Sequence, residues 1–238
     1  MRRPPRCSER VPIETVLETG STNDDLIARA ATAAPEGLWL RAEVQTGGRG
    51  RQGRAWISPP GNLYASTLVR IRSSDPPAPT LALLSAVALH EAVSLYAPRV
   101  RIKWPNDLLA DGAKLAGILL ERSGEAVVIG LGVNLAHHPE GLDRPVTSLH
   151  RLTGSAPEPS AFVELLSETF ARWLARWRGE GLGSVSRAWL AAAHPLGTAL
   201  STSEGEGLFD GLDKHGALRL RLADGTVRTI HAGDVFLI

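Results

Sequence analysis

TGGRGRQGRAWISPPG (residues 46–61) decides between two fold classes for this chain. Gly48, Gly50 and Gly53 fit the spacing G-x-G-x-x-G, which in dinucleotide-binding folds joins a strand to a helix whose N-terminus faces a pyrophosphate. Here Pro59-Pro60-Gly61 follows too closely for a helix to form. The sequence also lacks the G-K-[ST] tripeptide of a Walker loop. We therefore expect a loop between two strands, and not the first turn of a doubly wound α/β fold.

Short apolar segments surround this loop and alternate with a few helical ones. Alternating apolar and polar residues predict strands, and apolar positions three and four apart predict helices. The expected strands are 12–18, 38–46, 62–71, 100–104, 115–121 and 127–135, and the expected helices are 21–34, 80–97, 160–177 and 185–193. Because only short turns separate the strands between residues 100 and 135, we expect hairpins. The prediction is an α+β fold with a central mixed, mainly antiparallel sheet and flanking helices.

Beyond Pro195 the pattern changes to short strands that are punctuated by glycines. A segment of about forty residues of this kind predicts a small β-barrel, which would have to dock on a larger domain to be stable. We therefore divide the chain into a flexible leader (1–12), a main domain (13–194) and a C-terminal barrel (195–238).

Composition excludes several classes of protein. Of the 238 residues, 43% are hydrophobic and 21% are charged, as in ordinary globular proteins, and the net charge is only +1. A general affinity for nucleic acid would call for a more basic chain. The single cysteine, Cys7, excludes an internal disulfide, and no apolar run reaches the length of a membrane-spanning helix. Because residues 1–10 are basic but lack the apolar core of a secretory signal, we expect a cytoplasmic protein.

Three arginines in the loop, Arg49, Arg51 and Arg54, indicate a site for anions. One guanidinium group can bind two oxygens of a carboxylate or a phosphate at the same time. Gly48 and Gly50 carry no side chain that would keep backbone N–H groups away from an anion. Taken alone, the loop is better explained as a solvated basic turn, so the interpretation depends on other segments of the chain.

A second group of polar residues lies in KWPNDLLADGAKLAGILLE (103–121). Asn106 and Asp107 follow the end of an expected strand, and Lys114 opens the next one. That next strand contains Gly117, and a glycine inside a strand often marks the close approach of a ligand. The alternatives are that Asn106 and Asp107 only form a turn and that Lys114 is a surface residue beside a hairpin.

A third group combines Ser21, Thr22 and Asn23 with Gln45 at the end of the strand before the loop. These side chains are neutral donors and acceptors, which suit an uncharged polar ligand. Helix capping alone would also explain the first three residues, and Gln45 would then be an ordinary edge residue. Trp56 is explained equally well as a flat ligand surface and as an anchor of the loop in the core.

Together these segments resemble a biotin protein ligase, and the resemblance extends from about residue 13 to the C-terminal barrel. The matching pieces are STN (21–23), Q-x-x-G-R-G-R-x-G-R-x-W (45–56), SPPGNLY (58–64), KWPND (103–107), KLAGIL (114–119) and GLGVN (130–134). The motif GRGRxGR followed by KWPND is specific, whereas either one alone is weaker. The resemblance implies the class II synthetase-like fold of biotin and lipoate ligases, followed by an SH3-like barrel.

The resemblance also implies a reaction in two steps. The carboxylate of biotin attacks the α-phosphate of ATP in the presence of Mg²⁺, which gives biotinyl-5′-AMP and pyrophosphate. One lysine of a biotin carboxyl carrier protein, a domain of a biotin-dependent carboxylase, then attacks the acyl carbon and AMP leaves. Residues 13–194 would form the catalytic domain that binds biotin and ATP.

The same resemblance assigns roles to residues of this sequence. The implied catalytic residues are Lys114, Arg51 and Asp107. The implied biotin-binding residues are Ser21, Thr22, Asn23, Gln45, Gly48, Arg49, Gly50, Arg51, Lys114 and Gly117. The implied ATP-binding residues are Arg49, Arg51, Arg54, Trp56, Lys103, Asn106, Asp107, Lys114 and Asn134, with Asp107 as the nearest partner for Mg²⁺.

Two alternative functions remain open at this point. The first is a lipoate or octanoate protein ligase, against which the GRGRxGR loop argues. The second is a non-catalytic nucleotide-binding protein, which the low net charge and the joint presence of Lys114 and Asp107 disfavour. About twelve residues precede the first expected strand, too few for a helix-turn-helix domain, so we expect no DNA binding. We expect no membrane attachment either, and the sequence leaves open whether the chain forms a homodimer.

Overall fold

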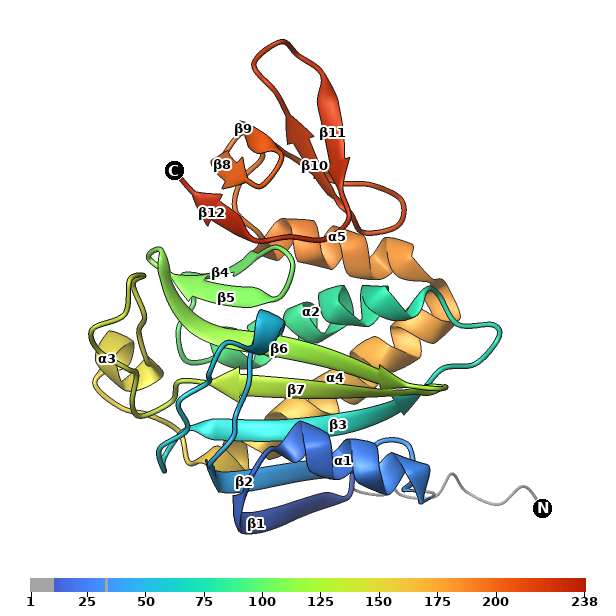
Figure 1. The fold of residues 1–238 in the computed structure, drawn as a ribbon, viewed down its shortest axis with the longest axis vertical. Coiled ribbons are helices and arrows are strands. Elements are labelled where there is room, and N and C mark those ends of the chain that lie inside the picture. The colour runs from blue at the N-terminus through green and yellow to red at the C-terminus, as the bar shows by residue number, and fades with distance from the viewer. Residues whose placement is uncertain (1–10, 33) are drawn as a thin grey trace, which may run out of the picture.

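The computed structural model of the chain describes residues 11–32 and 34–238. Within them it has the predicted α+β fold, in which a seven-stranded sheet carries the helices and a smaller five-stranded sheet follows at the C-terminus (Figure 1). Most of the predicted leader, residues 1–10, lies outside the described residues.

The larger sheet is mixed and mainly antiparallel, as predicted. In spatial order its strands are β1 (Ile13–Thr19), β2 (Trp39–Gln45), β3 (Leu63–Arg70), β7 (Ala126–Val133), β6 (Ala113–Ser123), β5 (Asp107–Ala110) and β4 (Val100–Lys103). Every neighbouring pair is antiparallel except β1 and β2, which are parallel because helix α1 (Thr22–Ala31) returns the chain between them.

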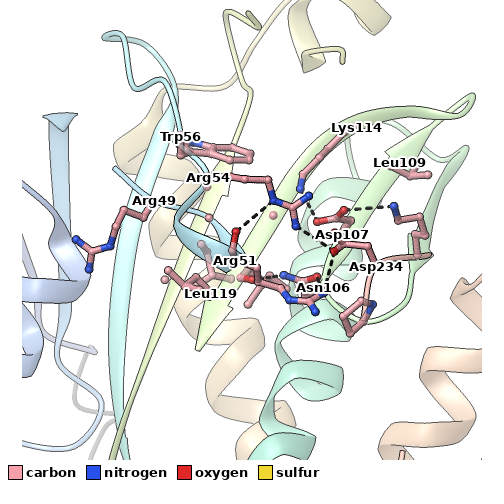
Figure 2. Close-up of a pocket in the computed structure, with 18 of the residues that line it drawn as sticks. Arg49, Arg51, Arg54, Trp56, Asn106, Asp107, Leu109, Lys114, Leu119 and Asp234 are labelled. Carbon is pink, nitrogen blue, oxygen red and sulfur yellow. Dashed lines mark hydrogen bonds and ion pairs between the residues drawn. The ribbon is translucent and has the colours of Figure 1, made fainter. Parts of the chain in front are cut away.

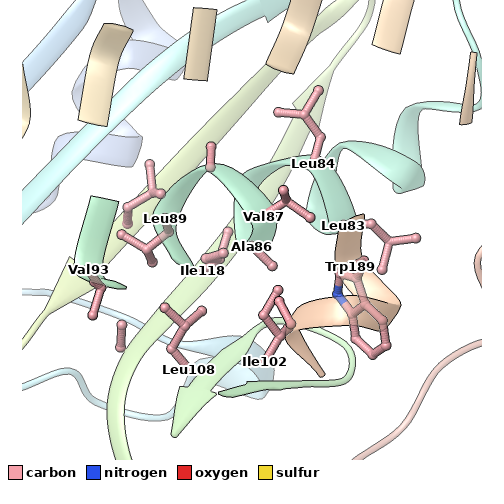
Figure 3. Packing of buried hydrophobic residues seen from close by; sticks show 14 of the residues in the cluster. Leu83, Leu84, Ala86, Val87, Leu89, Val93, Ile102, Leu108, Ile118 and Trp189 are labelled. Atoms are coloured by element: carbon pink, nitrogen blue, oxygen red, sulfur yellow. The ribbon is translucent and has the colours of Figure 1, made fainter. Parts of the chain in front are cut away.

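The helices lie on both faces of this sheet. Helix α1 packs on one face, while α2 (Leu81–Ser94), α4 (Pro159–Glu180) and α5 (Leu182–Ala192) form the layer on the other (Figure 1). Helix α2 is apolar nearly all round because it lies between the sheet and the two other helices. Figure 3 shows its side chains packed among Ile102, Leu108 and Ile118 of the sheet and Trp189 of α5. Among the described residues, no helix has the length and apolarity needed to cross a membrane.

The structure contains two short elements that the sequence did not predict, strand β5 and helix α3 (Leu149–Thr153). Strand β5 shows no alternation because Leu108, Leu109 and Ala110 are all buried. Helix α3 has only five residues, too few to show a helical period. Two single-turn 3₁₀ segments, Arg51–Gly53 and Ala78–Thr80, complete the main domain.

The C-terminal strands form the small SH3-like barrel that was predicted. They are β8 (Ala199–Thr202), β9 (Gly205–Leu212), β10 (Leu218–Arg221), β11 (Val227–Ile230) and β12 (Val235–Leu237), in the antiparallel order β11-β10-β9-β8-β12. The barrel docks on the main domain through the rings of Phe209 and Trp189, whose centroids lie 6.2 Å apart. This distance is within the range in which aromatic rings attract one another. Trp104 Nε1 also donates a hydrogen bond to Gly216 O at 3.2 Å. This docking brings the C-terminal strand beside the arginine loop.

Candidate active site

A cavity of about 250 Å³ opens on the face of the sheet that α1 covers only in part. Its walls come from the start of α1, the loop 46–56, the turn between β4 and β5, and the C-terminal segment 234–237. Of the residues that the resemblance implied, all but Gly48 and Asn134 line this cavity. The structure therefore brings the three polar groups of the sequence together at one place.

Two glycines form the floor of the cavity under the indole ring of Trp56. A Cβ atom at Gly132 would lie 2.6 Å from Trp56 Cε2, and one at Gly117 would lie 3.2 Å from Trp56 Cζ3. Only glycine lets the ring lie this close to β6 and β7. The indole is thus both an anchor of the loop and a flat wall of the cavity, and its Nε1 has no hydrogen-bond partner among the described residues.

One end of the cavity is neutral and polar. Thr22 N donates a hydrogen bond to Gln45 Oε1 at 2.8 Å, which joins the start of α1 to the end of β2. Ser21 is the N-cap of α1, since its side chain accepts a hydrogen bond from Asp24 N at 3.4 Å. The capping explanation of Ser21 is therefore correct as far as the fold is concerned. It does not exclude a ligand, because Ser21 also lines the cavity.

The other end of the cavity is cationic (Figure 2). Arg51 donates to Asn106 Oδ1 at 3.3 Å and to Gly233 O at 3.0 Å, and Arg54 donates to Asp234 Oδ1 at 3.0 Å. The two arginines come from one turn of the loop, so they share the carboxylate of Asp234, which lies 3.8 Å from Arg51. The C-terminal barrel thus holds the arginine loop over the sheet.

Arg49 points away from this cationic group, toward α1 (Figure 2). Its guanidinium binds both carboxylate oxygens of Asp24, at 2.6 and 2.7 Å, and lies 3.5 Å from Glu121. The hydrogen bonds from Arg49 hold the pKa of Asp24 below its ordinary value, and the pKa of Arg49 is raised in return. Three arginines that look equivalent in the sequence therefore have different surroundings.

Lys114 and Asp107 form a close ion pair at the centre of the cationic end. Lys114 Nζ donates to Asp107 Oδ1 at 2.6 Å, and Lys103 Nζ lies 3.6 Å from the other carboxylate oxygen. Burial lowers the pKa of Lys114, although Asp107 acts in the opposite direction, and the charges of Arg144 and Lys103 add to the lowering. Lys114 Nζ also lies 5.6 Å from the ring of Trp56, within reach of its π face.

This pairing does not suit a metal ion at Asp107. Both carboxylate oxygens face ammonium groups, which would repel a divalent cation. No cluster of three or more His, Cys, Asp or Glu residues with metal-binding geometry occurs in the described part of the chain. Mg²⁺ commonly reaches such sites with the phosphates of a nucleotide and through one or two carboxylates.

Two of the implied residues lie outside the cavity lining. Asn134 is buried, and its amide donates to Thr147 O at 3.0 Å, so it ties β7 to the segment before α3. Gly48 packs closely against the end of the loop. A Cβ atom there would lie 2.7 Å from Trp56 O and 2.9 Å from Ser58 Oγ, so only glycine fits at this position.

Several lining residues were missed by sequence reasoning. They include Tyr64, Gly132, Arg144, Asp234 and Phe236. Gly132 lies in a strand, as Gly117 does, so the argument that singled out Gly117 applied to it equally. Asp234 and Phe236 belong to the barrel, and nothing near them in the sequence connects them with the loop.

Comparison with known proteins defines the class to which this fold and site belong. Residues 20–134 match the model of the biotin/lipoate A/B protein ligase family. Residues 201–238 match the model of the biotin protein ligase C-terminal domain. The first match covers α1 and strands β2 to β7 with the arginine loop, and the second covers most of the barrel.

Relatives that match over nearly the whole chain narrow the class further. The biotin–[acetyl-CoA-carboxylase] ligase of Paracoccus denitrificans is 40% identical over 93% of this chain and 98% of its own length. That of Mycobacterium tuberculosis is 34% identical over 94% of this chain and 88% of its own length. The chain therefore belongs to the biotin protein ligases of the biotin/lipoate A/B protein ligase family.

Solved structures agree in fold. A biotin protein ligase from Aquifex aeolicus in complex with biotin and ATP matches with a TM-score of 0.85 at 24% identity, over 95% of this chain and 99% of the other. One from Leishmania major in complex with biotinyl-5-AMP matches with a TM-score of 0.68 at 26% identity, over 97% of this chain and 100% of the other.

Proposed function

We propose that this chain activates biotin with ATP to biotinyl-5′-AMP and transfers the biotinyl group to one lysine of a biotin carboxyl carrier protein. The observation that carries the proposal is the polarity of one cavity, which joins a neutral end at Thr22 and Gln45 to a cationic end at Arg51, Arg54 and Lys114. A ureido ring needs neutral donors and acceptors, and a carboxylate that meets a phosphate needs positive charge.

In the first step a carboxylate oxygen of biotin forms a bond to the α-phosphorus of ATP, and the bond to pyrophosphate breaks. Both reactants are anions, so the cavity has to neutralise them and hold them in line. Lys114 supplies a charge at the centre of the cationic end, and Arg51 and Arg54 supply two more from the loop. The indole of Trp56 offers a flat apolar wall to a ring of the ligand.

In the second step the amine of the carrier lysine attacks the acyl carbon and AMP leaves. The amine must be neutral to attack, and the ordinary pKa of lysine is about 10.4, so a group near the acyl carbon has to accept a proton. Asp107 is the proposed acceptor, because its carboxylate lies beside Lys114 in the cavity lining.

Mg²⁺ would stabilise charge on the departing pyrophosphate when it is bound. The pairing of Asp107 with Lys114 and Lys103 gives no support to a metal ligand at this carboxylate, and no step is derived through it.

The proposed partner is the carrier domain of a biotin-dependent carboxylase, and the proposed compartment is the cytoplasm. We propose no DNA-binding function and no membrane attachment, and we make no choice between a monomer and a homodimer. The division at residues 194 and 195 into a catalytic domain and a barrel is consistent with the two separate sheets.

The proposal is tested by incubating the protein with biotin, ATP and a carrier domain of a biotin-dependent carboxylase. We expect the carrier to gain the mass of one biotinyl group, and a carrier whose acceptor lysine is replaced by arginine to gain none. Lipoate and octanoate, offered in place of biotin, serve as controls for the related ligases. Transfer of lipoate or octanoate without transfer of biotin would contradict the proposal.

A further inference from the structure

Ser66 carries a fully buried hydroxyl on β3. It lies behind the neutral end, where its Oγ is 2.6 Å from Asn23 Oδ1 and 2.7 Å from Thr22 Oγ1. It does not line the cavity itself. A buried hydroxyl between two lining residues fixes which of their atoms are donors and which are acceptors.

Glu121 determines which atoms donate and which accept in these hydrogen bonds. Asn23 Nδ2 lies 2.7 Å from Glu121 Oε2 and 3.4 Å from Leu119 O, and both of these atoms are acceptors. The amide of Asn23 is therefore oriented with its nitrogen toward β6 and its oxygen toward Ser66. Gly130 makes room for this amide, because a Cβ atom there would collide with Asn23 Oδ1.

The orientation of Asn23 determines the role of Thr22. Asn23 Oδ1 carries no proton, so Ser66 must donate its single proton to it. Ser66 Oγ then faces Thr22 Oγ1 as an acceptor, and the proton of Thr22 points to Ser66, or to Gln45 Oε1 at 3.1 Å. In both cases the protein uses the only proton of Thr22, so Thr22 Oγ1 offers the cavity lone pairs alone.

The side-chain amide of Gln45, unlike the hydroxyl of Thr22, offers the cavity a hydrogen-bond donor. Its Oε1 accepts from Thr22 N at 2.8 Å, so its Nε2 is the donor end, and the one hydrogen bond of this nitrogen within the described residues is a long contact of 3.4 Å to Ser58 Oγ. The neutral end of the cavity thus presents an acceptor, Thr22 Oγ1, beside a donor, Gln45 Nε2.

We propose that Ser66 is a positioning residue, which with Asn23 and Glu121 sets the neutral end of the cavity to recognise a cyclic urea. A urea has N–H groups on both sides of a carbonyl, so Thr22 Oγ1 accepts from a ring N–H and Gln45 Nε2 donates to the carbonyl oxygen. Asn23 acts through Ser66 and not by binding the ring. This inference rests on the proposed function and adds to it the origin of the selectivity for the ring.

The first test compares Ser66→Ala with Thr67→Val in biotin-dependent exchange of pyrophosphate into ATP. Thr67 is an equally buried hydroxyl on the next residue of β3, where it donates to Leu38 O and faces the opposite side of the sheet. In Ser66→Ala, Asn23 Oδ1 loses its donor and the proton of Thr22 keeps only the longer contact of 3.1 Å to Gln45 Oε1, so the side chains of the neutral end are held less firmly and we expect the KM for biotin to rise roughly tenfold. The KM for ATP should stay within about twofold, and Thr67→Val should change neither value.

Ser66→Cys, which keeps the volume and is a weak donor, should change the KM for biotin in the same direction and by less. Unchanged values in both Ser66 variants would overturn the proposal, as would an equal rise in both KM values, which a purely structural role would produce. If the wild-type protein shows no biotin-dependent exchange at all, the proposed function fails and this inference fails with it.

The second test uses a biotin analogue in which one ring N–H is replaced by oxygen, with each of the two positions tried. For the position that faces Thr22, this oxygen meets a lone pair in the wild-type protein, whereas in Ser66→Ala the proton of Thr22 can turn from Gln45 Oε1 and donate to it. The preference for biotin over that analogue should therefore shrink roughly tenfold or more in the variant. An unchanged preference for both analogues would contradict the assigned direction of the hydrogen bonds.

Discussion

Replacing Lys114 by methionine removes the central charge of the cavity and keeps most of the side-chain volume. Lys114 Nζ lies 2.6 Å from Asp107 Oδ1, and the side chains are only 16% and 13% exposed, so little water replaces the lost charge. Loss of one preorganised hydrogen-bond donor to a developing negative charge typically costs about 2.7–4 kcal/mol of transition-state stabilisation, or roughly a hundredfold to a thousandfold in rate, and we expect at least this for Lys114.

The fold should tolerate this change better than the reaction does. Lys103 Nζ remains 3.6 Å from Asp107, so the carboxylate is not left without a partner. We expect the free energy of unfolding to fall by less than the roughly 3–5 kcal/mol that breaking a buried ion pair costs when one charge is left unpaired.

The assay is the rate of biotinyl-5′-AMP formation at saturating biotin and ATP, with urea unfolding measured on the same samples. The matched control is Lys214→Met, because Lys214 is exposed on the barrel and does not line the cavity. A rate for Lys114→Met within about threefold of the wild type, with the fold intact, would refute the role given to this charge.

Three further predictions concern the floor of the cavity, the barrel and a half-buried histidine. Gly132→Ala should lower the rate of adenylation at least tenfold, because a Cβ atom 2.6 Å from Trp56 Cε2 displaces the ring; steady-state kinetics with a melting curve measures this. Asp234→Ala should increase protease cleavage of the loop 46–56 by releasing Arg54, and should change the free energy of unfolding by less than about 1 kcal/mol because the pair is partly exposed. Burial lowers the pKa of His90, so the unfolded chain binds the proton more readily, and the stability present above about pH 6.5 declines as the pH falls below it. Urea unfolding at pH 7.5 and 5.5 should show a smaller decline in His90→Gln than in the wild type.

Local patterns predicted most of the fold. Alternation along the chain and short turns between strands are properties of neighbouring residues, so the mixed sheet and the order of its hairpins followed from them. Strand β5 did not, because three successive buried residues show no period of two. Helix α3 was also too short for a period, and only Ser148 as its N-cap and Gly154 after its end could have indicated it.

The site was predicted less completely, because part of it depends on contacts between distant segments. Arg54 and Asp234 are 180 residues apart, and no local pattern connects them. The sequence likewise presents Arg49 and Arg51 as equivalent, whereas the path of the loop directs Arg49 to Asp24 and Arg51 to Asn106. Side-chain direction in a glycine-rich loop depends on backbone angles that composition does not determine.

Exchange of labelled pyrophosphate into ATP tests the central claim most directly, because it reports formation of the acyl-adenylate without a carrier protein. We predict exchange with biotin, and none without it or with lipoate or octanoate in its place. Exchange that is independent of biotin, or that occurs only with lipoate or octanoate, would contradict the account.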